Sequence, residues 1–488
     1  MSILMKSCFN YAIKEILFVV SLLLLGGIEA TVNPRFYPRY HLAPPYGWMN
    51  DPNGFCVYKN EYHLFYQFNP NSSLEPGIAN WGHAKSKDLF HWEHLPIALF
   101  PDQSYDDVGA FSGSAIVEDG NMYLFYTGNG KTQQTQELAL SNDGYHIFKY
   151  QQNPIIIGEA RQPNFRDPKV WKHKGTYYMV LGNSFVKHNK RYGRVLLYKS
   201  KDKYNWCEVA ILAESDGFLG YMYECPDFFE IDGKFILMFS PQGVEPQGDS
   251  YKNLYQTGYI VGNFDYRTKK FKPITPFIEL DHGHDFYATQ SIEDNVGRRI
   301  VIAWLDMWET NYAEAKDGFT GQMTIPRTLT LSKNNSLLQK PVSEISTIRD
   351  KTLYKGSNKT KVKVALIDKI GEILVTAKRG TSFDVVIKSN DSSATATLSY
   401  DSASQYVSLN RGGKDGVRRA KWIPKGNIKW QIFVDASSIE LFCGDGELTF
   451  SSRFFPKTDI SVSLISTTPV NSFIVNALQR SVPYVCGI

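Results

Sequence analysis

Pairs of apolar, β-rich runs separated by tight polar turns recur through the first two thirds of the chain. In each pair a short strand pattern leads to a Gly, Asn or Asp turn and then to a strongly apolar, aromatic run, as in EYHLFYQF and NMYLFYTG. The turns end at Asn60, Gly120, Gly175, Gly233 and Gly297, which are about 60 residues apart. Each pair is typical of a β-hairpin, so the pattern predicts five similar hairpin units.

Hairpins that recur at a nearly constant period of this length favour a five-bladed β-propeller, in which four-stranded sheets surround a central channel. A β-sandwich is the alternative, but its strands recur about every 8–12 residues rather than in units of this size. We therefore expect an all-β fold whose propeller covers residues 31–330.

The pattern changes after Arg327. Residues 331–347 are polar and contain a proline, and they predict a linker. Over residues 348–488, short alternating runs such as VKVALID, FDVVIKS and IKWQIFVD follow one another closely, which is typical of a β-sandwich. The chain therefore predicts a propeller followed by a C-terminal β-sandwich.

Residues 1–30 show the succession of charged, apolar and small residues that is typical of a secretory signal peptide. Lys6 and Lys14 come before an apolar run from Ile16 to Leu25, and the small residue Ala30 follows. A run of this length is too short to span a bilayer, although a membrane anchor or a buried helix is the alternative interpretation. We expect removal of this peptide, secretion to the extracellular space, and no membrane association of the mature chain.

Composition and charge narrow the classes of function. The net charge is +4 and no block of five like charges occurs, so nothing indicates a nucleic-acid partner. Five scattered cysteines follow the signal peptide, and because their number is odd at least one thiol stays free or pairs between chains. Candidate glycosylation triplets of the N-x-S/T type begin at Asn71, Asn334, Asn358 and Asn390. The sequence indicates no particular oligomeric state.

Three carboxylates occupy the same phase of the repeat. Asp51, Asp167 and Glu224 each lie eight or nine residues before the turn of their hairpin, and a proline follows each within two residues. Equivalent positions in a propeller are related by rotation about its axis, so these side chains should meet at the channel mouth. Crowded carboxylates raise the pKa of at least one member, which is a cost found mainly at sites of acid–base chemistry or metal binding.

Two carboxyl groups in different protonation states are the catalytic groups that most glycoside hydrolases use. The ionised one attacks or stabilises the sugar centre, and the protonated one donates to the leaving oxygen. Candidate sugar-holding side chains accompany them in the sequence: Asn50, Gln67, Ser112 and Arg166 as hydrogen-bonding groups, and Trp48, Trp81 and Phe111 as flat walls. Because neighbouring strand residues point to opposite faces, Arg166 and Asp167 should diverge unless the strand begins between them.

Other uses of these residues are less well supported. No Asp-x-Asp-x-Asp run indicates a calcium site, and His282 and His284 have no evident third ligand, so we expect neither a metal nor a cofactor. Cys225 has no evident histidine partner, which favours a buried thiol over a nucleophile. A non-catalytic sugar-binding propeller is an alternative of another class, but it would not need three acids in register.

Several motifs resemble those of glycoside hydrolase family 32, which includes invertases, fructanases and sucrose-6-phosphate hydrolases. They are WMNDPNG at 48–54, QFNP at 67–70, WGHAKSKDLFHW at 81–92, FSGSA at 111–115, FRDP at 165–168, YECPD at 223–227 and DFYATQ at 285–290. DASSIELFCGDGE at 435–447 is similar to a segment of the family's C-terminal sandwich. The resemblance therefore covers the whole mature chain.

The resemblance implies a role for each acid. It makes Asp51 the nucleophile that attacks the anomeric C2 of a fructosyl unit, Glu224 the acid/base, and Asp167 an ionised group that holds fructose hydroxyls. The outcome would be retention, with the carboxyl groups of the nucleophile and the acid/base about 5–5.5 Å apart. The other positions that it implies for the fructose pocket are Asn50, Gln67, Phe111, Ser112, Arg166, Tyr287 and Trp304.

The resemblance, taken with the expected secretion, implies a sucrose-hydrolysing β-fructofuranosidase, because phosphorylated sugars are normally found inside cells. Raffinose-type sugars are further substrates to expect. A fructan exo-hydrolase or a fructosyltransferase on the same scaffold would share every catalytic residue. An inverting five-bladed glycosidase acting on arabinose or xylose polymers is a rival that the WMNDPNG segment opposes. The chain departs from many relatives at Pro76, where they carry a tryptophan, and this leaves the sugar site beyond fructose open.

Overall fold

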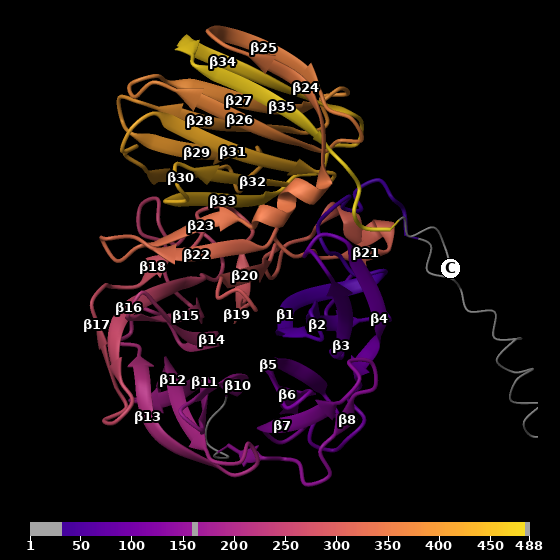
Figure 1. Ribbon diagram of the computed structural model, residues 1–488, viewed down its shortest axis with the longest axis vertical. Helices are drawn as coiled ribbons and strands as arrows, with labels where there is room; N and C mark the ends of the chain where they lie inside the picture. The colour runs from indigo at the N-terminus through magenta and orange to yellow at the C-terminus, as the bar shows by residue number, and fades with distance from the viewer. Residues whose placement is uncertain (1–31, 159–163, 484–488) are drawn as a thin grey trace, which may run out of the picture.

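The computed structural model describes residues 32–158 and 164–483, so the signal peptide expected at 1–30 lies outside the described residues. Five antiparallel sheets are arranged in a ring, and two six-stranded sheets follow them (Figure 1). The helical elements of the described residues are two short 3-10 helices, η1 (Ala313–Asp317) and η2 (Ser343–Ile348). The all-β prediction, a five-bladed propeller followed by a sandwich, is confirmed.

Each blade is a sheet of four main strands taken in chain order. The first blade contains β1 (Gly47–Tyr58), β2 (Glu61–Asn69), β3 (Asn80–Ser86) and β4 (Trp92–Leu99). The second contains β5 (Gly109–Glu118), β6 (Asn121–Asn129), β7 (Gln134–Ser141) and β8 (Phe148–Lys149). The third contains β10 (Asn164–His173), β11 (Thr176–Lys187), β12 (Lys190–Ser200) and β13 (Trp206–Glu214). The fourth contains β14 (Met222–Ile231), β15 (Lys234–Gln242), β16 (Gly258–Asp265) and β17 (Lys270–Pro273). The fifth contains β19 (Tyr287–Glu293), β20 (Arg299–Trp304), β22 (Arg327–Leu331) and β23 (Leu337–Pro341).

Three two-residue strands complete these sheets. They are β9 (Ile156–Ile157), which pairs with β7, β18 (Ile278–Glu279), which pairs with β16, and β21 (Phe319–Thr320), which pairs in parallel with β1. The first strands of the blades contact one another in the order β1, β5, β10, β14 and β19, and β19 contacts β1. These five strands therefore surround the axis of the ring.

All five hairpins expected from the repeat are present, as β1–β2, β5–β6, β10–β11, β14–β15 and β19–β20. The first turn consists of Lys59 and Asn60, with φ of 48° and 64°. Two left-handed residues in succession match the twist of the flanking strands. In the next three hairpins Gly120, Gly175 and Gly233 supply the second of these residues, which they do without a steric cost.

The linker predicted at 331–347 is largely wrong. Leu337–Pro341 forms β23, the last strand of the fifth blade, and pairs with β22 from Arg327 onward. The polar side chain of Gln339 is buried because it donates to the carbonyl oxygen of Leu280 and accepts from the Arg327 guanidinium. Composition alone made this strand look like a loop, since its polar groups are satisfied by partners distant in sequence.

The C-terminal strands form two facing sheets. One has the order β24 (Arg349–Gly356), β35 (Ser472–Leu478), β26 (Gly371–Ala377), β31 (Ile428–Asp435), β32 (Ser438–Cys443) and β33 (Leu448–Arg453). The other has the order β25 (Lys359–Ala365), β34 (Ile460–Val470), β27 (Phe383–Ser389), β28 (Thr395–Asp401), β29 (Tyr406–Asn410) and β30 (Val417–Lys421). Alternate residues of both sheets meet in one buried apolar core.

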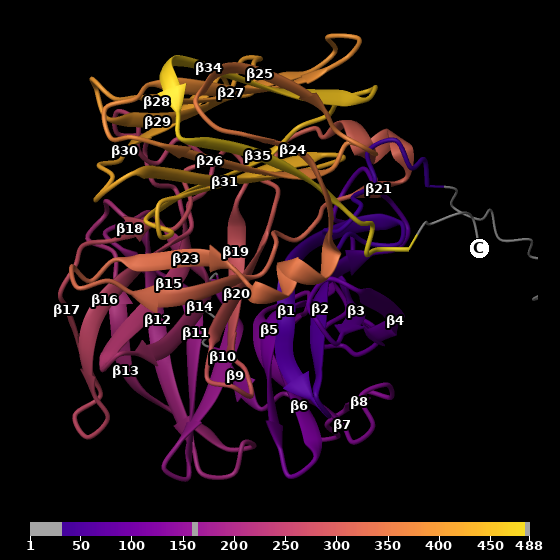
Figure 2. The same cartoon turned by 45° about the horizontal axis from the view of Figure 1, so that its top comes forward.

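A second apolar cluster joins the two domains. It combines Phe55 and Ile302 of the propeller with Ile370, Phe433 and Phe442 of the sandwich. Figures 1 and 2 show the sandwich lying against the side of the ring that contains the fifth and first blades. The domains therefore share buried surface. Within the ranges that the structure describes, no helix is long and apolar enough to cross a membrane.

Candidate active site

The first strand of every blade contains a β-bulge at the phase of the predicted acids. The register shifts between Met49 and Pro52 in β1 and between Arg166 and Lys169 in β10, with corresponding shifts in β5, β14 and β19. Asp167, inside the β10 bulge, has φ of 67°. A bulge re-aims the side chains around it. The expected divergence of Arg166 and Asp167 is therefore wrong: β10 begins before both residues, yet both reach the same site.

Asp51 accepts three side-chain hydrogen bonds. Ser112 Oγ donates to Oδ2 at 2.6 Å, Asn50 Nδ2 donates to Oδ1 at 3.1 Å, and Cys225 Sγ lies 3.4 Å from Oδ2. The Asn50 amide is fixed in turn, because Trp48 Nε1 donates to its Oδ1 at 3.1 Å. Donors favour the ionised form of a carboxylate, and that form is the one a nucleophile requires.

Asp167 approaches Asp51 through Cys225. The Cys225 backbone N–H donates to Asp167 Oδ2 at 2.9 Å, and its sulfur lies 3.8 Å from the same oxygen. Burial raises the pKa of the Cys225 thiol well above its usual value, and the neighbouring carboxylates add to the effect. The sulfur is therefore a protonated donor between two acids, in keeping with the buried thiol expected from the sequence.

Glu224 is held at both oxygens. Arg166 donates to Oε1 from Nε at 3.0 Å and from Nη2 at 2.6 Å. Gln242 Nε2 and the Tyr287 hydroxyl donate to Oε2, at 2.9 Å and 2.5 Å. Arg166 Nε also lies 3.9 Å from Asp167 Oδ2, so one guanidinium faces two of the three acids. Residues from the third, fourth and fifth blades thus fix one carboxyl group.

The charges of neighbouring acids add to the burial that raises the pKa values of Asp51 and Asp167. Burial is the largest cause of the raised pKa of Asp51, the charge of Glu224 is the next, and the donors from Ser112 and Asn50 oppose both. Burial also raises the pKa of Asp167 to about 7; the charge of Arg166 opposes this, and the charges of the other two acids add to it. A cluster of this kind retains a proton near neutral pH, which is what a pair of acid and nucleophile needs.

The remaining residues that were predicted to line the pocket differ in burial and in their hydrogen-bond partners. Phe111 is half-buried, and Gln67 is buried with its amide donating to the carbonyl oxygen of Ala110 at 2.9 Å. Trp81 and Trp304 are fully buried, so neither forms the exposed wall that was expected of Trp81. Trp81 instead supports the wall, because its Nε1 donates to the Phe111 carbonyl oxygen at 3.0 Å.

Two site residues were missed from the sequence. Gln242 ends β15 and contacts Glu224, but nothing in its local sequence distinguishes it from a solvated turn residue. Trp308 follows β20, and its half-buried indole stacks on Trp48 with ring centroids 6.3 Å apart and planes 22° apart. Its signal was its position four residues after Trp304, the residue that was expected to reach the pocket itself.

The two histidines weighed as metal ligands have other partners. His284 Nδ1 lies 3.1 Å from Ser452 Oγ, and His284 Nε2 lies 3.0 Å from the Gly416 carbonyl oxygen. His282 Nδ1 lies 3.8 Å from the carboxylate of Glu279. Among the described residues no group of three His, Cys, Asp or Glu side chains is arranged to hold a metal ion.

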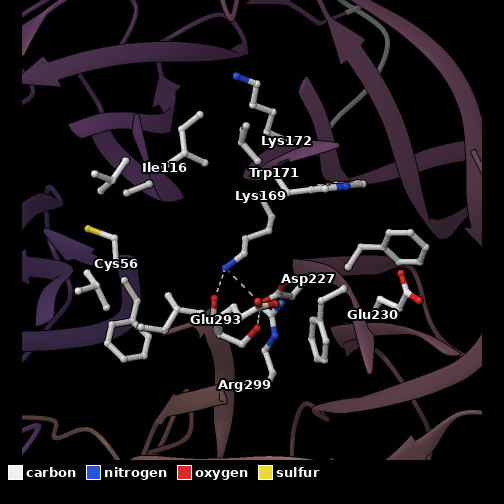
Figure 3. Close-up of a pocket in the computed structure, with 18 of the residues that line it drawn as sticks. Cys56, Ile116, Lys169, Trp171, Lys172, Asp227, Glu230, Glu293 and Arg299 are labelled. Atoms are coloured by element: carbon white, nitrogen blue, oxygen red, sulfur yellow. Dashed lines mark hydrogen bonds and ion pairs between the residues drawn. The ribbon is translucent and has the colours of Figure 1, made fainter. Parts of the chain in front are cut away.

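A cavity of about 580 Å³ lies further along the same first strands, away from the three acids. Figure 3 shows Lys169 pointing across it toward Asp227, and the two groups are 3.3 Å apart. Lys169 also donates to Gln290 Oε1 at 3.0 Å and to the Ser291 carbonyl oxygen at 2.5 Å. These bonds join the third, fourth and fifth blades across the channel, which is a structural role.

Known proteins match this chain over both of its domains. The model of the glycosyl hydrolases family 32 N-terminal domain matches residues 41–341, and that of the family 32 C-terminal domain matches residues 335–476. A sucrose-6-phosphate hydrolase of Zymomonas mobilis is 37% identical over 466 residues, covering 88% of each chain. A raffinose invertase of Escherichia coli is 36% identical over 457 residues, covering 89% of this chain and 93% of the relative.

Solved structures show the same architecture. A Bombyx mori GH32 β-fructofuranosidase superimposes with a TM-score of 0.87 at 42% identity, covering 93% of this chain and 96% of that one. The same enzyme has been solved as a mutant in complex with sucrose. A sucrose-6-phosphate hydrolase from Lactobacillus gasseri superimposes with a TM-score of 0.85 at 28% identity, again covering 93% and 96%. The matches run through both domains, and the chain is a glycoside hydrolase that belongs to family 32.

Proposed function

We propose that this enzyme is a β-fructofuranosidase that hydrolyses sucrose by a retaining, two-step mechanism. The observation that carries the proposal is the joining of three carboxylates from three blades into one hydrogen-bonded cluster through Arg166 and Cys225. Asp51 is the nucleophile, Glu224 the acid/base, and Asp167 the group that binds fructose hydroxyls.

In the first step an oxygen of Asp51 attacks the anomeric C2 of the fructosyl unit as the bond from C2 to the glycosidic oxygen breaks. Glu224 gives its proton to that oxygen, so the glucose leaves as a neutral alcohol. The developing positive charge on the sugar ring lies beside the carboxylate of Asp167, which stabilises it in a site partly removed from water.

In the second step a water molecule takes the place of the departed sugar. Glu224 removes a proton from the water, the oxygen attacks C2, and the ester bond between C2 and Asp51 breaks to restore the carboxylate. Arg166, Gln242 and Tyr287 hold the Glu224 carboxyl in one place through both steps. Such positioning contributes to rate by avoiding reorganisation at the moment of reaction.

The relatives support sucrose as the fructoside. They include a raffinose invertase and a β-fructofuranosidase whose mutant was solved with sucrose, and they also include sucrose-6-phosphate hydrolases. The substrates that these names state all contain a fructosyl unit linked to another sugar. A pocket that binds fructose is therefore what the relatives are expected to have in common. The leaving sugar is what an assay must distinguish.

The test compares the mature chain, residues 31–488, with Asp51→Asn, Asp167→Asn and Glu224→Gln variants. Sucrose, raffinose, sucrose 6-phosphate and inulin are each supplied, and free glucose and fructose are measured. Glu230→Gln provides a matched control, because this exposed acid lies on the same strand as Glu224 but is not a member of the cluster. We expect equal release of both sugars from sucrose, and a loss of at least about a thousandfold in Asp51→Asn.

Each other outcome has a defined meaning. Glucose in excess of fructose would show transfer of fructose to another sugar, and release from sucrose 6-phosphate alone would move the enzyme to phosphorylated sugars. Release from inulin alone would make it a fructan exo-hydrolase. Inactivity on every fructoside would overturn the proposal in favour of a sugar-binding propeller.

We further propose that the enzyme is exported, with residues 1–30 removed, and glycosylated. Asn71, Asn334, Asn358 and Asn390, which begin the N-x-S/T triplets, are all exposed, as acceptors must be. Expression of the full chain in a secreting eukaryotic cell should yield medium protein that begins near residue 31 and loses mass on deglycosylation. Retention of the full-length chain inside the cell would contradict export.

A further inference from the structure

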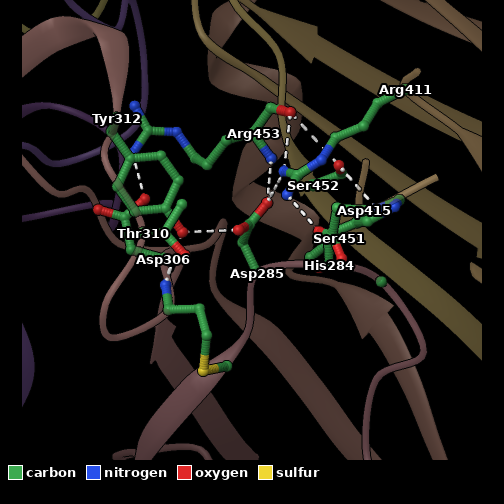
Figure 4. Close-up of polar contacts among 12 residues, drawn as sticks. His284, Asp285, Asp306, Thr310, Tyr312, Arg411, Asp415, Ser451, Ser452 and Arg453 are labelled. Atoms are coloured by element: carbon green, nitrogen blue, oxygen red, sulfur yellow. Dashed lines mark hydrogen bonds and ion pairs between the residues drawn. The ribbon is translucent and has the colours of Figure 1, made fainter. Parts of the chain in front are cut away.

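A buried ionic network joins the sandwich to the two propeller segments that lead into the site. Asp285, immediately before β19, is at its centre (Figure 4). Its Oδ2 accepts from the backbone N–H of Arg453 at 2.7 Å and from the Arg411 guanidinium, and both arginines belong to the sandwich. Its Oδ1 accepts from the Tyr312 hydroxyl at 2.6 Å. Asp285 is 1% exposed, so these bonds replace water completely.

The Arg453 guanidinium reaches a second segment of the propeller. One of its terminal nitrogens donates to Asp306, and the other lies 2.7 Å from Glu314 Oε1. Its Nε donates to the Ser437 carbonyl oxygen at 3.0 Å, which fixes the plane of the group. Arg453 and both acids are fully buried at their side chains. One sandwich residue thus contacts the segment before β19 through its backbone and the segment after β20 through its guanidinium.

Tyr312 ties these two segments to each other. Its hydroxyl donates to Asp285 and accepts from the backbone N–H of Met307 at 2.7 Å. The hydroxyl therefore fixes the distance between the start of β19 and the loop after β20.

Each segment leads to one of the proposed catalytic carboxylates. Two residues after Asp285, Tyr287 donates to Glu224. Two residues after Asp306, the indole of Trp308 stacks on Trp48. Trp48 in turn donates to Asn50, which donates to Asp51, so this second route ends at the nucleophile.

We propose that Arg453 and Tyr312 are positioning residues for the reaction: through Asp285 and Asp306 they set the placement of Tyr287 against Glu224 and of Trp308 against Trp48 and Asp51. The sandwich domain is then a working part of the active site rather than only a support beside it. This inference rests on the proposed function for its kinetic consequence, although the geometry that it describes can be measured without substrate.

The test uses Tyr312→Phe in the full mature chain, because this change removes one hydroxyl and keeps the buried ring. The matched control is Tyr259→Phe, whose hydroxyl likewise accepts a buried backbone N–H, that of Leu337, at 2.9 Å, but leads to neither carboxylate. Both variants lose one tyrosine, so their near-ultraviolet circular dichroism can be compared directly. Arg453→Lys, which keeps the charge but loses the planar fork, is measured beside them.

We expect Tyr312→Phe to lower kcat on sucrose by about 10- to 100-fold with KM changed less than about threefold, since small misplacements at a site cost rate in this range. The tryptophan band of the near-ultraviolet spectrum should change as well, because Trp48, Trp304 and Trp308 pack together. Tyr259→Phe should lower only the melting temperature. A folded Tyr312→Phe variant with wild-type kcat and an unchanged tryptophan band would overturn the inference, whether or not Arg453→Lys folds. If the wild type cleaves no fructoside but Tyr312→Phe still changes the tryptophan band, the positioning is supported and only the proposed function is contradicted.

Discussion

The chemistry of Asp51 depends on what its neighbours donate. Burial and the charge of Glu224 raise its pKa, whereas Ser112, Asn50 and Cys225 donate to the charged form and lower it. The positions of the acids can be predicted from the sequence, because their phase in the repeat is visible. The balance between the opposing effects on their pKa values cannot be predicted in this way. That balance depends on distances such as the 2.6 Å between Ser112 Oγ and Asp51.

Ser112→Ala tests this balance. Loss of a donor to the ionised form raises the pKa of Asp51 further, and the proposed nucleophile must be ionised to react. The acidic limb of the pH profile of kcat/KM should therefore move to higher pH, with activity lost earlier on acidification than in the wild type. Ser114→Ala is the control, since this buried serine of the same strand accepts from the Val170 backbone and leaves Asp51 untouched. An acidic limb at the same pH in both variants would contradict the assignment.

At the scale of elements, hairpins were predictable and bulges were not. The five turns were visible because tight turns need residues that tolerate positive φ, such as Gly120 and Asn60. The five bulges could not be predicted, because the rule that neighbouring side chains point to opposite faces holds only for regular strands. That is why Arg166 and Asp167 were expected to diverge. The prolines that follow the acids were the available signal, because proline in a strand marks a bulge or an edge.

Close approach between blades fixes where Glu224 lies. Gly182 of β11 lies so near β14 that a Cβ added there would be 2.1 Å from the Tyr223 carbonyl oxygen. Gly182→Ala must therefore push the strand that carries Glu224. We expect a loss of about 1–3 kcal/mol in the free energy of unfolding, together with a fall in kcat measured well below the melting temperature.

The control for this change is Gly426→Ala. Nothing lies within 4 Å of a Cβ built at Gly426, so this variant should match the wild type in both measurements. A Gly182→Ala variant with unaltered stability would show that the blades can separate without cost, contrary to the packing described here.

At the scale of the whole molecule, the presence of two domains could be predicted from the change of sequence pattern after Arg327. The contacts that attach the two domains to each other could not. Arg327 itself is fully buried and pairs with Asp281 of the propeller and Glu440 of the sandwich. Buried ion pairs between residues 46 and 113 positions apart leave no local signal. Arg327 also donates to Gln339 within the fifth blade, so the polar segment around Gln339 is a strand and not a linker.

His41 makes the attachment sensitive to pH. Its ring nitrogens lie 2.7 Å from Asp435 and 2.8 Å from Glu440, both in the sandwich. Burial alone would lower its pKa, but the two carboxylates outweigh burial and raise the pKa to about 9. Because this value lies above that of an unfolded histidine, the stabilisation is fully present below about pH 6.5 and is lost as the pH rises through about 9.

His41→Gln removes this charge between two buried carboxylates. We expect a loss of about 3–5 kcal/mol in the free energy of unfolding at pH 6.5, and a smaller difference from the wild type at pH 9.5, both measured in urea. His91→Gln is the control, because its ion pair with Asp88 is largely exposed and contributes little. A difference that stays constant across this pH range would show that His41 is neutral in the folded protein.

The central claim is that Asp51 forms a covalent bond to fructose while Glu224 handles the proton. It is tested most directly with Glu224→Ala and β-fructofuranosyl fluoride, whose leaving group needs no proton, so that the first step proceeds and the second is slow. We expect intact mass spectrometry to show one added fructosyl unit, peptide mapping to place it on Asp51, and the Asp51→Asn, Glu224→Ala double variant to show none. An adduct on another residue, or turnover of the fluoride by the double variant, would contradict it.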